Sequence, residues 1–355
     1  MNRFNHISFL LVLLLYAAIG GCIDQISFDS EKSQGQLVMS GKIYDGPGPY
    51  YLQLGMTTTE NTLPLPETGA EITIFNNQGE QDYYIETETA GRYILPGNIV
   101  SGERGETYHI EIELQDGRTF SSLPETIPLH TGHDEVFLEP GLYEHQPTRG
   151  NVVEAEGIYI YANTQIPEHE NPLYLKWDLE SMYLFRETEP SSPLAPPANT
   201  CYVTDPINPQ TISLYSTQES GSGTIQRQFL GIKDIIPDQF YIRHYVNLIV
   251  SSVTERRYNY WQKVDDAINQ TGTIFDVPPA TIPGNIQNED GDLTEAFGYF
   301  EAAAIDTTRS FLIKSDLETF IQNPCPQGFN VNSPSACGNC LLLENSTLER
   351  PPYLP

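Results

Sequence analysis

Cys22 is the residue whose surroundings most clearly indicate chemistry. It follows Gly20 and Gly21, which end a short apolar run over residues 7–19, and the chain begins with the charged Arg3. A charged start, a short apolar segment and small residues at the cut are features of a secretory signal peptide. The apolar run is shorter than the roughly 20 residues that a membrane-spanning helix needs. A cysteine directly after the cut is typical of bacterial lipoproteins, in which the thiol is diacylated before cleavage.

The sequence therefore predicts a signal peptide over residues 1–21, a lipidated Cys22 and a polar tether over residues 22–36. Acyl chains would then hold the protein on a membrane. The alternative is an ordinary signal peptide in which Cys22 has no role.

Four further cysteines follow: Cys201, Cys325, Cys337 and Cys340. Outside the cytoplasm an even number indicates disulfides, and four cysteines allow three pairings. The last two have the spacing of a redox pair or half a zinc site. No strand and helix flank them as in a thioredoxin-like motif, and no second pair completes a zinc site. We favour disulfides that close the C-terminal tail onto the second domain, with zinc as the alternative.

Residues 288–292 are the best candidate for binding a cation. Asn288, Asp290 and Asp292 offer hard oxygen ligands, and Gly291 allows the backbone to turn sharply, as calcium sites require. A complete EF-hand spacing is absent. An exposed acidic turn is the favoured interpretation, and a calcium site is the alternative; no other cofactor is expected.

Catalytic motifs are missing from the sequence. There is no nucleophile elbow, no H-E-x-x-H, no P-loop and no dinucleotide-binding fingerprint. His130 and His133 lie close together beside Asp134, but in a linker-like stretch where a solvated turn is favoured over a metal cluster. We expect the protein not to be an enzyme. A hydrolase with an unfamiliar site is the least favoured alternative.

Composition restricts the partners and the fold class. The chain has 47 acidic and 18 basic residues, a formal net charge of −29, which argues against binding to nucleic acid or to anionic lipid. It also has 21 tyrosines, 27 glycines and 27 prolines, which favours strands joined by many turns. We expect a mainly β protein.

The elements that must position these residues fall into two groups. Short alternating segments with turns between them predict an Ig-like or transthyretin-like antiparallel sandwich over residues 37–125. Residues 126–355 are expected to form a larger β-rich domain with one or two helices. One helix is predicted over residues 254–268, capped by Thr254, with apolar residues at helical spacing. The segments read as strands are 37–43, 50–54, 70–75, 83–87, 91–94, 107–114, 119–122, 136–138, 157–163, 173–185, 239–254, 297–302 and 310–314.

Several segments together resemble a known family. They include 258–262, 272–276, 282–286 and 298–300, preceded by the segment 38–51 and followed by Cys337 and Cys340. In order and spacing these segments resemble a Bacteroidota family of lipoproteins that is catalogued only as a domain of unknown function, numbered four-two-four-nine. The resemblance spans nearly the whole mature chain.

The resemblance implies an outer-membrane lipoprotein, often encoded beside TonB-dependent receptors, and it supplies no catalytic residues. We therefore expect a lipid-anchored accessory or binding protein on the extracellular face of the outer membrane. It would act with a TonB-dependent transporter in the capture or uptake of a ligand. The alternative is a stand-alone surface adhesin that binds glycans or peptides, for which an exposed aromatic platform is expected.

Overall fold

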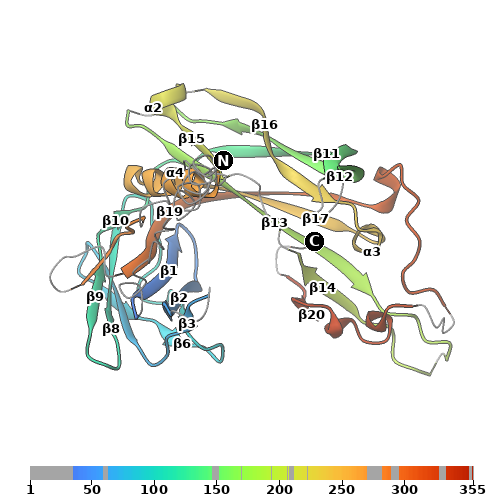
Figure 1. Ribbon diagram of the computed structural model, residues 1–355, viewed down its shortest axis with the longest axis horizontal. Helices are drawn as coiled ribbons and strands as arrows, with labels where there is room; N and C mark the ends of the chain where they lie inside the picture. Colours follow the sequence, from blue (N-terminus) through green and yellow to red (C-terminus); the bar gives the residue numbers. More distant parts are fainter. Residues whose placement is uncertain are drawn as a thin grey trace, which may run out of the picture.

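Long strands of one large sheet run through the whole molecule (Figure 1). The computed structural model describes residues 35–58, 63–145, 152–168, 170–192, 194–205, 207, 212–221, 223–269, 282–288, 296–327, 333–351 and 354. Cys22, Asp290 and Asp292 lie outside these residues. Three sheets and a few short helices confirm the predicted mainly β class.

The large sheet has the strand order β20-β14-β13-β17-β19-β1-β2-β7-β6, with β15 beside β13 and β3 beside β2. In Figure 1 the sheet extends from β1 and β2 at the lower left, through β19, β17 and β13, to β14 and β20 at the lower right. Their bounds are β1 Leu37–Tyr44, β2 Tyr50–Met56, β3 Leu65–Pro66, β6 Ile85–Glu86, β7 Arg92–Leu95, β13 Tyr174–Arg186, β14 Thr200–Thr204, β15 Ser213–Ser216, β17 His244–Val253, β19 Ala296–Leu312 and β20 Ser346–Thr347.

The first part of this sheet and a second sheet form a sandwich at the lower left of Figure 1. The second sheet has the order β18-β9-β8-β4-β5, with β10 beside β8. Side chains of the two sheets share one apolar core, as the alternating burial of β1 and β8 requires. The bounds are β4 Glu71–Asn76, β5 Gln81–Tyr83, β8 Thr107–Glu113, β9 Thr119–Ser122, β10 Glu125–Thr126 and β18 Ile286–Asn288.

Strands from the C-terminal half complete this sandwich. β1 pairs in parallel with β19, from Leu37 opposite Ala296 to Tyr44 opposite Ala303, and β18 pairs with β9. Ile286 and Phe300 are fully buried in the sandwich core. The segments before and after residue 125 therefore share both sheets.

The third sheet has the order β11-β12-β16 and lies along the upper side of Figure 1. Its strands are β11 His133–His145, β12 Val153–Gln165 and β16 Thr224–Asp234. One face packs in a second apolar core with residues of β13 and β17, including Trp177 and Leu248.

The main helix, α4 (Glu255–Asn269), confirms the helix predicted over residues 254–268. The Arg257 backbone N–H donates to Thr254 Oγ1 at 3.3 Å, so Thr254 caps the helix as expected. The predicted apolar stripe is only partly buried, since Tyr258 is 4% exposed and Ile268 is 60% exposed. The remaining helical turns are α2 Thr217–Ser220, α3 Pro237–Phe240, η2 Lys314–Asp316, η3 Ser335–Cys337 and η4 Cys340–Leu342.

Some predicted strand limits were wrong. The segment 297–302 and the first three residues of the segment 310–314 belong to one strand, β19, because the polar residues between them continue the pairing with β17. β19 ends at Leu312, and Lys314 begins η2. Residues 239–254 hold the end of α3 and then β17, and β14 and β16 were not predicted. None of the helices in the described residues has the length and apolar character of a membrane span.

Candidate functional site

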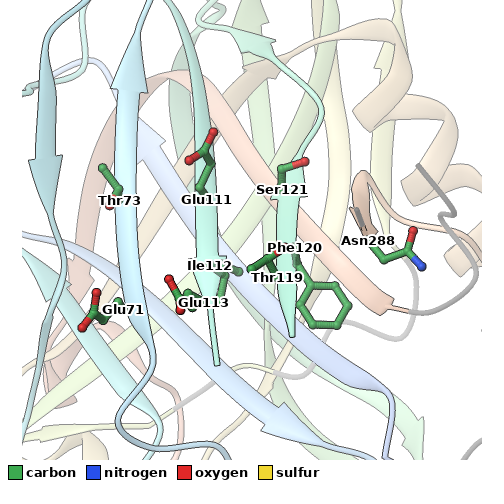
Figure 2. A pocket seen from close by; sticks show the side chains of 9 residues that line it. All are labelled: Glu71, Thr73, Glu111, Ile112, Glu113, Thr119, Phe120, Ser121 and Asn288. Carbon is green, nitrogen blue, oxygen red and sulfur yellow. The ribbon is translucent and has the colours of Figure 1, made fainter. Parts of the chain in front are cut away.

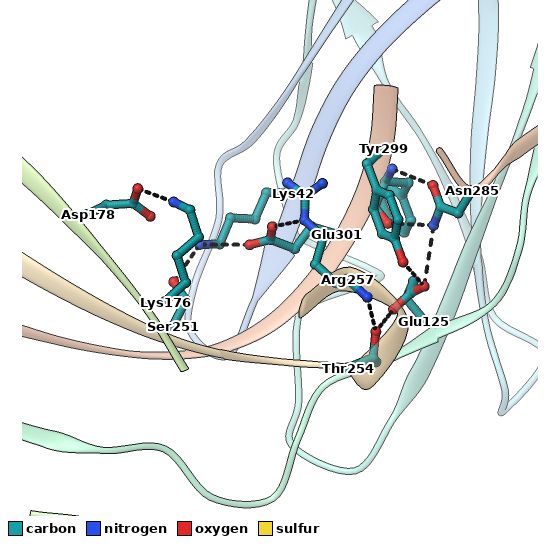
Figure 3. A network of polar contacts seen from close by, with 11 residues as sticks. Lys42, Glu125, Lys176, Asp178, Ser251, Thr254, Arg257, Asn285, Tyr299 and Glu301 are labelled. Atoms are coloured by element: carbon teal, nitrogen blue, oxygen red, sulfur yellow. Dashed lines mark hydrogen bonds and ion pairs between the residues drawn. The ribbon is translucent and has the colours of Figure 1, made fainter. Parts of the chain in front are cut away.

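Charged and polar residues, most of them buried, cluster where α4 meets the large sheet (Figure 3). We call them the junction network: Lys42, Glu125, Lys176, Arg256, Arg257, Asn285, Tyr299 and Glu301. They come from β1, β10, β13, α4, β18 with its preceding turn, and β19. The network thus joins the sandwich to the rest of the protein.

Glu301 lies at the centre of this network, in the buried part of β19. Its Oε1 is 3.1 Å from Lys42 Nζ, and its Oε2 accepts a hydrogen bond from Arg257 Nε at 2.5 Å. Burial acts to raise the pKa of Glu301, but the cations of Lys42, Arg257 and Lys176 outweigh it and hold that pKa well below its ordinary value. Glu301 is therefore an ionised carboxylate in the folded protein.

Aromatic rings lie against two of the cations near Glu301, Arg257 and Lys176. The Arg257 guanidinium lies 4.4 Å from the ring centroids of Trp261 and Tyr299. Lys176 Nζ lies 4.5 Å from the Trp261 ring and also pairs with Asp178. Such cation–π contacts are strongest where water is excluded.

Glu125 is the second buried carboxylate of the junction network, with 1% of its surface exposed. It accepts hydrogen bonds from Tyr299 Oη at 2.6 Å and from Thr254 Oγ1, and it pairs with Arg256 at 3.2 Å. Burial raises the pKa of Glu125 even though these donors act to lower it. The amide of Asn285, which also reaches Glu125, is fixed by two 2.8 Å bonds to the backbone of Phe300.

This geometry favours a structural role for both carboxylates. A general acid or base must reach a substrate proton at hydrogen-bonding distance. Glu125 borders an open hollow with Glu255 and Asn259, but its oxygens are already occupied by four side chains. Glu301 is enclosed by its cations. The network can fix the junction, and it offers no free carboxylate to a substrate.

An acidic hollow of about 360 Å³ lies on the outer side of the sandwich (Figure 2). Glu71, Glu111 and Glu113 extend into it from β4 and β8, beside Thr119 and Ser121 of β9. Glu71 and Glu113 are direct cross-strand neighbours, an arrangement of like charges that costs free energy.

Asn288 lies at the rim of this hollow and is the one described member of the calcium candidate. Its proposed companions Asp290 and Asp292 lie outside the described residues, so the predicted calcium site stays a prediction. The described part of the chain holds no group of three or more His, Cys, Asp or Glu residues that could bind a metal.

The histidine pair near residue 130 does not converge on a metal-ligand set in the described residues. His133 is exposed, and its Nδ1 lies 2.6 Å from Asp306 Oδ2 of β19. Asp134 instead points inward and accepts hydrogen bonds from Thr164 and Trp177.

The four later cysteines form two disulfides, Cys201–Cys340 and Cys325–Cys337. The sequence left three pairings open, and the structure selects one in which the C-x-x-C residues belong to different bridges. All four are buried. Cys201–Cys340 closes the tail onto β14, and Cys325–Cys337 closes a loop within the tail. Disulfides, the favoured interpretation, are confirmed over zinc.

Sequence reasoning missed the junction network. One signal was available. Glu301 lies in the run Phe297–Ala304, in which all the remaining residues are apolar, aromatic or glycine. A lone acid in such a run indicates a buried charge that needs a partner. Its partners Lys42 and Arg257 are distant in sequence, and no local pattern indicates them.

The comparisons with known proteins agree with the motifs. The model of a family described as a domain of unknown function (DUF4249) matches residues 23–309. No curated protein is detectably similar to the chain.

Proposed function

The chain belongs to the DUF4249 family, and we propose that it is a lipid-anchored binding protein of the outer membrane and not an enzyme. In this proposal it faces the outside of the cell. It captures a ligand and delivers it to a TonB-dependent transporter.

The cysteines are the observation that carries this proposal. The chain has five, and the four after Cys22 are all paired in disulfides. Disulfides persist in oxidising compartments outside the cytoplasm. Cys22 is then the single cysteine left over, and it lies directly after the small residues of a signal-like segment. Both facts support export followed by acylation of Cys22.

The folded body supports binding over catalysis. Its buried carboxylates in the junction network are occupied by neighbouring side chains. Sheet faces remain open, including the acidic hollow. The transporter as partner rests on the family resemblance given under "Sequence analysis".

Metabolic labelling tests the anchor. Cells that express the full-length protein are grown with an alkyne fatty acid, and the purified protein is assayed for label. We expect label on the wild type and on the nearby control Ser27→Ala, and none on Cys22→Ser. A labelled Cys22→Ser protein would show that acylation occurs elsewhere.

Co-purification from gently solubilised outer membranes tests the partner, and protease treatment of intact cells tests the orientation. We expect a β-barrel receptor to accompany the wild type and the protein to be cut on intact cells. If no β-barrel receptor co-purifies and the protein still binds its ligand, the stand-alone adhesin would be favoured. A protein cut only after lysis would face the periplasm.

A further inference from the structure

The third sheet presents aromatic side chains on the face opposite its core. Along β12, Ile158, Ile160 and Ala162 are buried in the second core. Because side chains alternate across a strand, Tyr159 and Tyr161 point to the other side. In Figure 1 this sheet lies along the upper border of the molecule.

Register brings rings from three strands together on that side. Phe137 of β11 and Phe229 of β16 lie opposite Tyr161 on its two sides. Ring centroids are 5.7 Å apart for Tyr161 and Phe229, and 6.3 Å apart for Tyr159 and Tyr161. We call Phe137, Tyr159, Tyr161 and Phe229 the aromatic face. Phe229 is 46% exposed, and the other three are partly exposed.

Two facing glycines let rings lie close to the backbone. Gly141 and Gly157 are paired across β11 and β12. A Cβ atom on Gly141 would come within 3.0 Å of the Tyr159 ring, and one on Gly157 within 2.9 Å of the Tyr143 ring. The Tyr159 hydroxyl donates to the Leu142 carbonyl at 2.7 Å, and the Tyr143 hydroxyl bonds to Asp234. These contacts hold the rings against the sheet and widen the aromatic surface.

Arg227 adds a fixed polar group to the aromatic face. Its guanidinium lies 4.3 Å from the Tyr161 ring centroid and makes two hydrogen bonds to Glu139, at 2.8 and 2.7 Å. Arg227 has φ = 52° at an irregularity in the β12–β16 pairing, and its N–H donates to Asn163 Oδ1 at 2.8 Å. A bulge of this kind redirects a side chain.

The backbone of Arg227 is strained, and the ion pair of its side chain offsets little of that strain. A non-glycine residue with φ > 0 is held in a sparsely populated conformation. An exposed salt bridge adds little stability, and the side chains of Arg227 and Glu139 are 62% and 45% exposed. Such strain is often found where a side chain serves binding.

We propose that the aromatic face binds a neutral oligosaccharide; this names the ligand class of the binding function proposed above and rests on it. The apolar C–H faces of sugar rings pack on aromatic rings. The remaining N–H groups of Arg227 and the oxygens of Glu139 can bond to sugar hydroxyls.

Charge selects a neutral ligand over an anionic one. Arg227 and Glu139 neutralise each other, and the other charged residues on this side of the sheet include Glu135 and Asp234. The whole chain carries −29. Uronic or sialic acids would be repelled by this field.

The test uses the purified full-length protein in detergent and saturation-transfer NMR with titration. The probes are hexaoses of α-glucan, β-glucan, mannan and xylan, with hexagalacturonate as the anionic probe. We expect binding of at least one neutral hexaose and none of hexagalacturonate. Phe229→Ala should weaken that binding at least tenfold. The control Phe320→Ala, at a phenylalanine that is 82% exposed elsewhere, should leave it unchanged.

Arg227→Gly separates a binding role from a structural one. Glycine adopts φ > 0 without strain, so we expect the variant to be as stable as the wild type or more stable, yet to bind at least fivefold more weakly.

The proposal is overturned if no neutral hexaose binds, if Phe229→Ala binds as the wild type does, or if hexagalacturonate binds more tightly. Self-association that Phe229→Ala abolishes would instead assign the face to a second copy of the chain. Because these measurements need no membrane partner, they are independent of the anchoring and co-purification experiments.

Discussion

Glu301 and Glu125 carry the same group in one network, yet their surroundings act on them in opposite directions. The cations of Lys42, Arg257 and Lys176 outweigh burial and keep Glu301 ionised, whereas burial outweighs the hydrogen-bond donors and Arg256 at Glu125. A buried ion pair loses about 3–5 kcal/mol when one partner is removed, because the other charge remains buried. The two carboxylates should therefore respond differently to the same substitution.

We expect Glu301→Gln to lower the free energy of unfolding at pH 7 by about 3–5 kcal/mol, since Lys42 and Arg257 keep their charge. The matched variant Glu125→Gln should stay within about 1 kcal/mol of the wild type, because an amide can still bond to Tyr299 and Thr254. Urea unfolding monitored by circular dichroism measures both. Equal losses in the two variants would contradict the difference in environment.

Urea unfolding of the same variants at lower pH tests the direction of each pKa shift. The pKa of Glu301 is lowered in the folded state, so its stabilisation is present above about pH 4.5 and declines as the pH falls below that value. The deficit of Glu301→Gln should therefore shrink at pH 3.5. The pKa of Glu125 is raised, so its ionisation costs stability as the pH rises above about 4.5. Glu125→Gln should accordingly compare more favourably with the wild type at pH 7 than at pH 3.5.

At the scale of elements, α4 is placed by its first turn. Thr254 caps the helix through the Arg257 N–H and also bonds to Glu125 of β10. One hydroxyl thus joins the helix start to the sandwich. The helix could be predicted from local sequence, because cap and periodicity are local signals. Its attachment to the sheets could not be predicted in this way. Glu125 lies 129 residues from Thr254 in sequence, and Glu301 lies 44 residues from Arg257.

We expect Thr254→Val to lower the free energy of unfolding by about 2–3 kcal/mol, as it removes a cap and leaves Glu125 with one donor fewer. Thr254→Ser keeps the hydroxyl and should lie within about 0.5 kcal/mol of the wild type. Thermal and urea unfolding of both variants provide the measurement. A serine variant as unstable as the valine variant would contradict this assignment, because serine keeps the hydroxyl and loses only the methyl group.

For the molecule as a whole, the sandwich depends on two strands from the C-terminal part of the sequence, β18 and β19. β19 pairs with all of β1, and β18 pairs with β9. Without them β1 would expose its edge, and the core would lose Ile286 and Phe300. The domain boundary predicted at residue 125 can be tested directly for this reason.

We expect residues 22–125 alone to show no cooperative unfolding transition. Adding residues 282–304 through a flexible linker should restore one, because it supplies β18 and the part of β19 that pairs with β1. Amide dispersion in NMR spectra and urea unfolding compare the two polypeptides. Cooperative unfolding of residues 22–125 alone would establish an autonomous first domain.

The sequence by itself determined the mainly β class, the helix after Thr254 and the presence of disulfides, because each depends on local patterns or on a count of cysteines. It also predicts the acylation of Cys22, through a motif that needs no fold. Only the tertiary structure decided which cysteines pair, that β1 and β19 lie side by side, and that Glu301 meets Lys42 and Arg257. It also brought three strands together to form the aromatic face. These contacts join residues far apart in the chain, and strand register and core packing fix them where local propensity cannot.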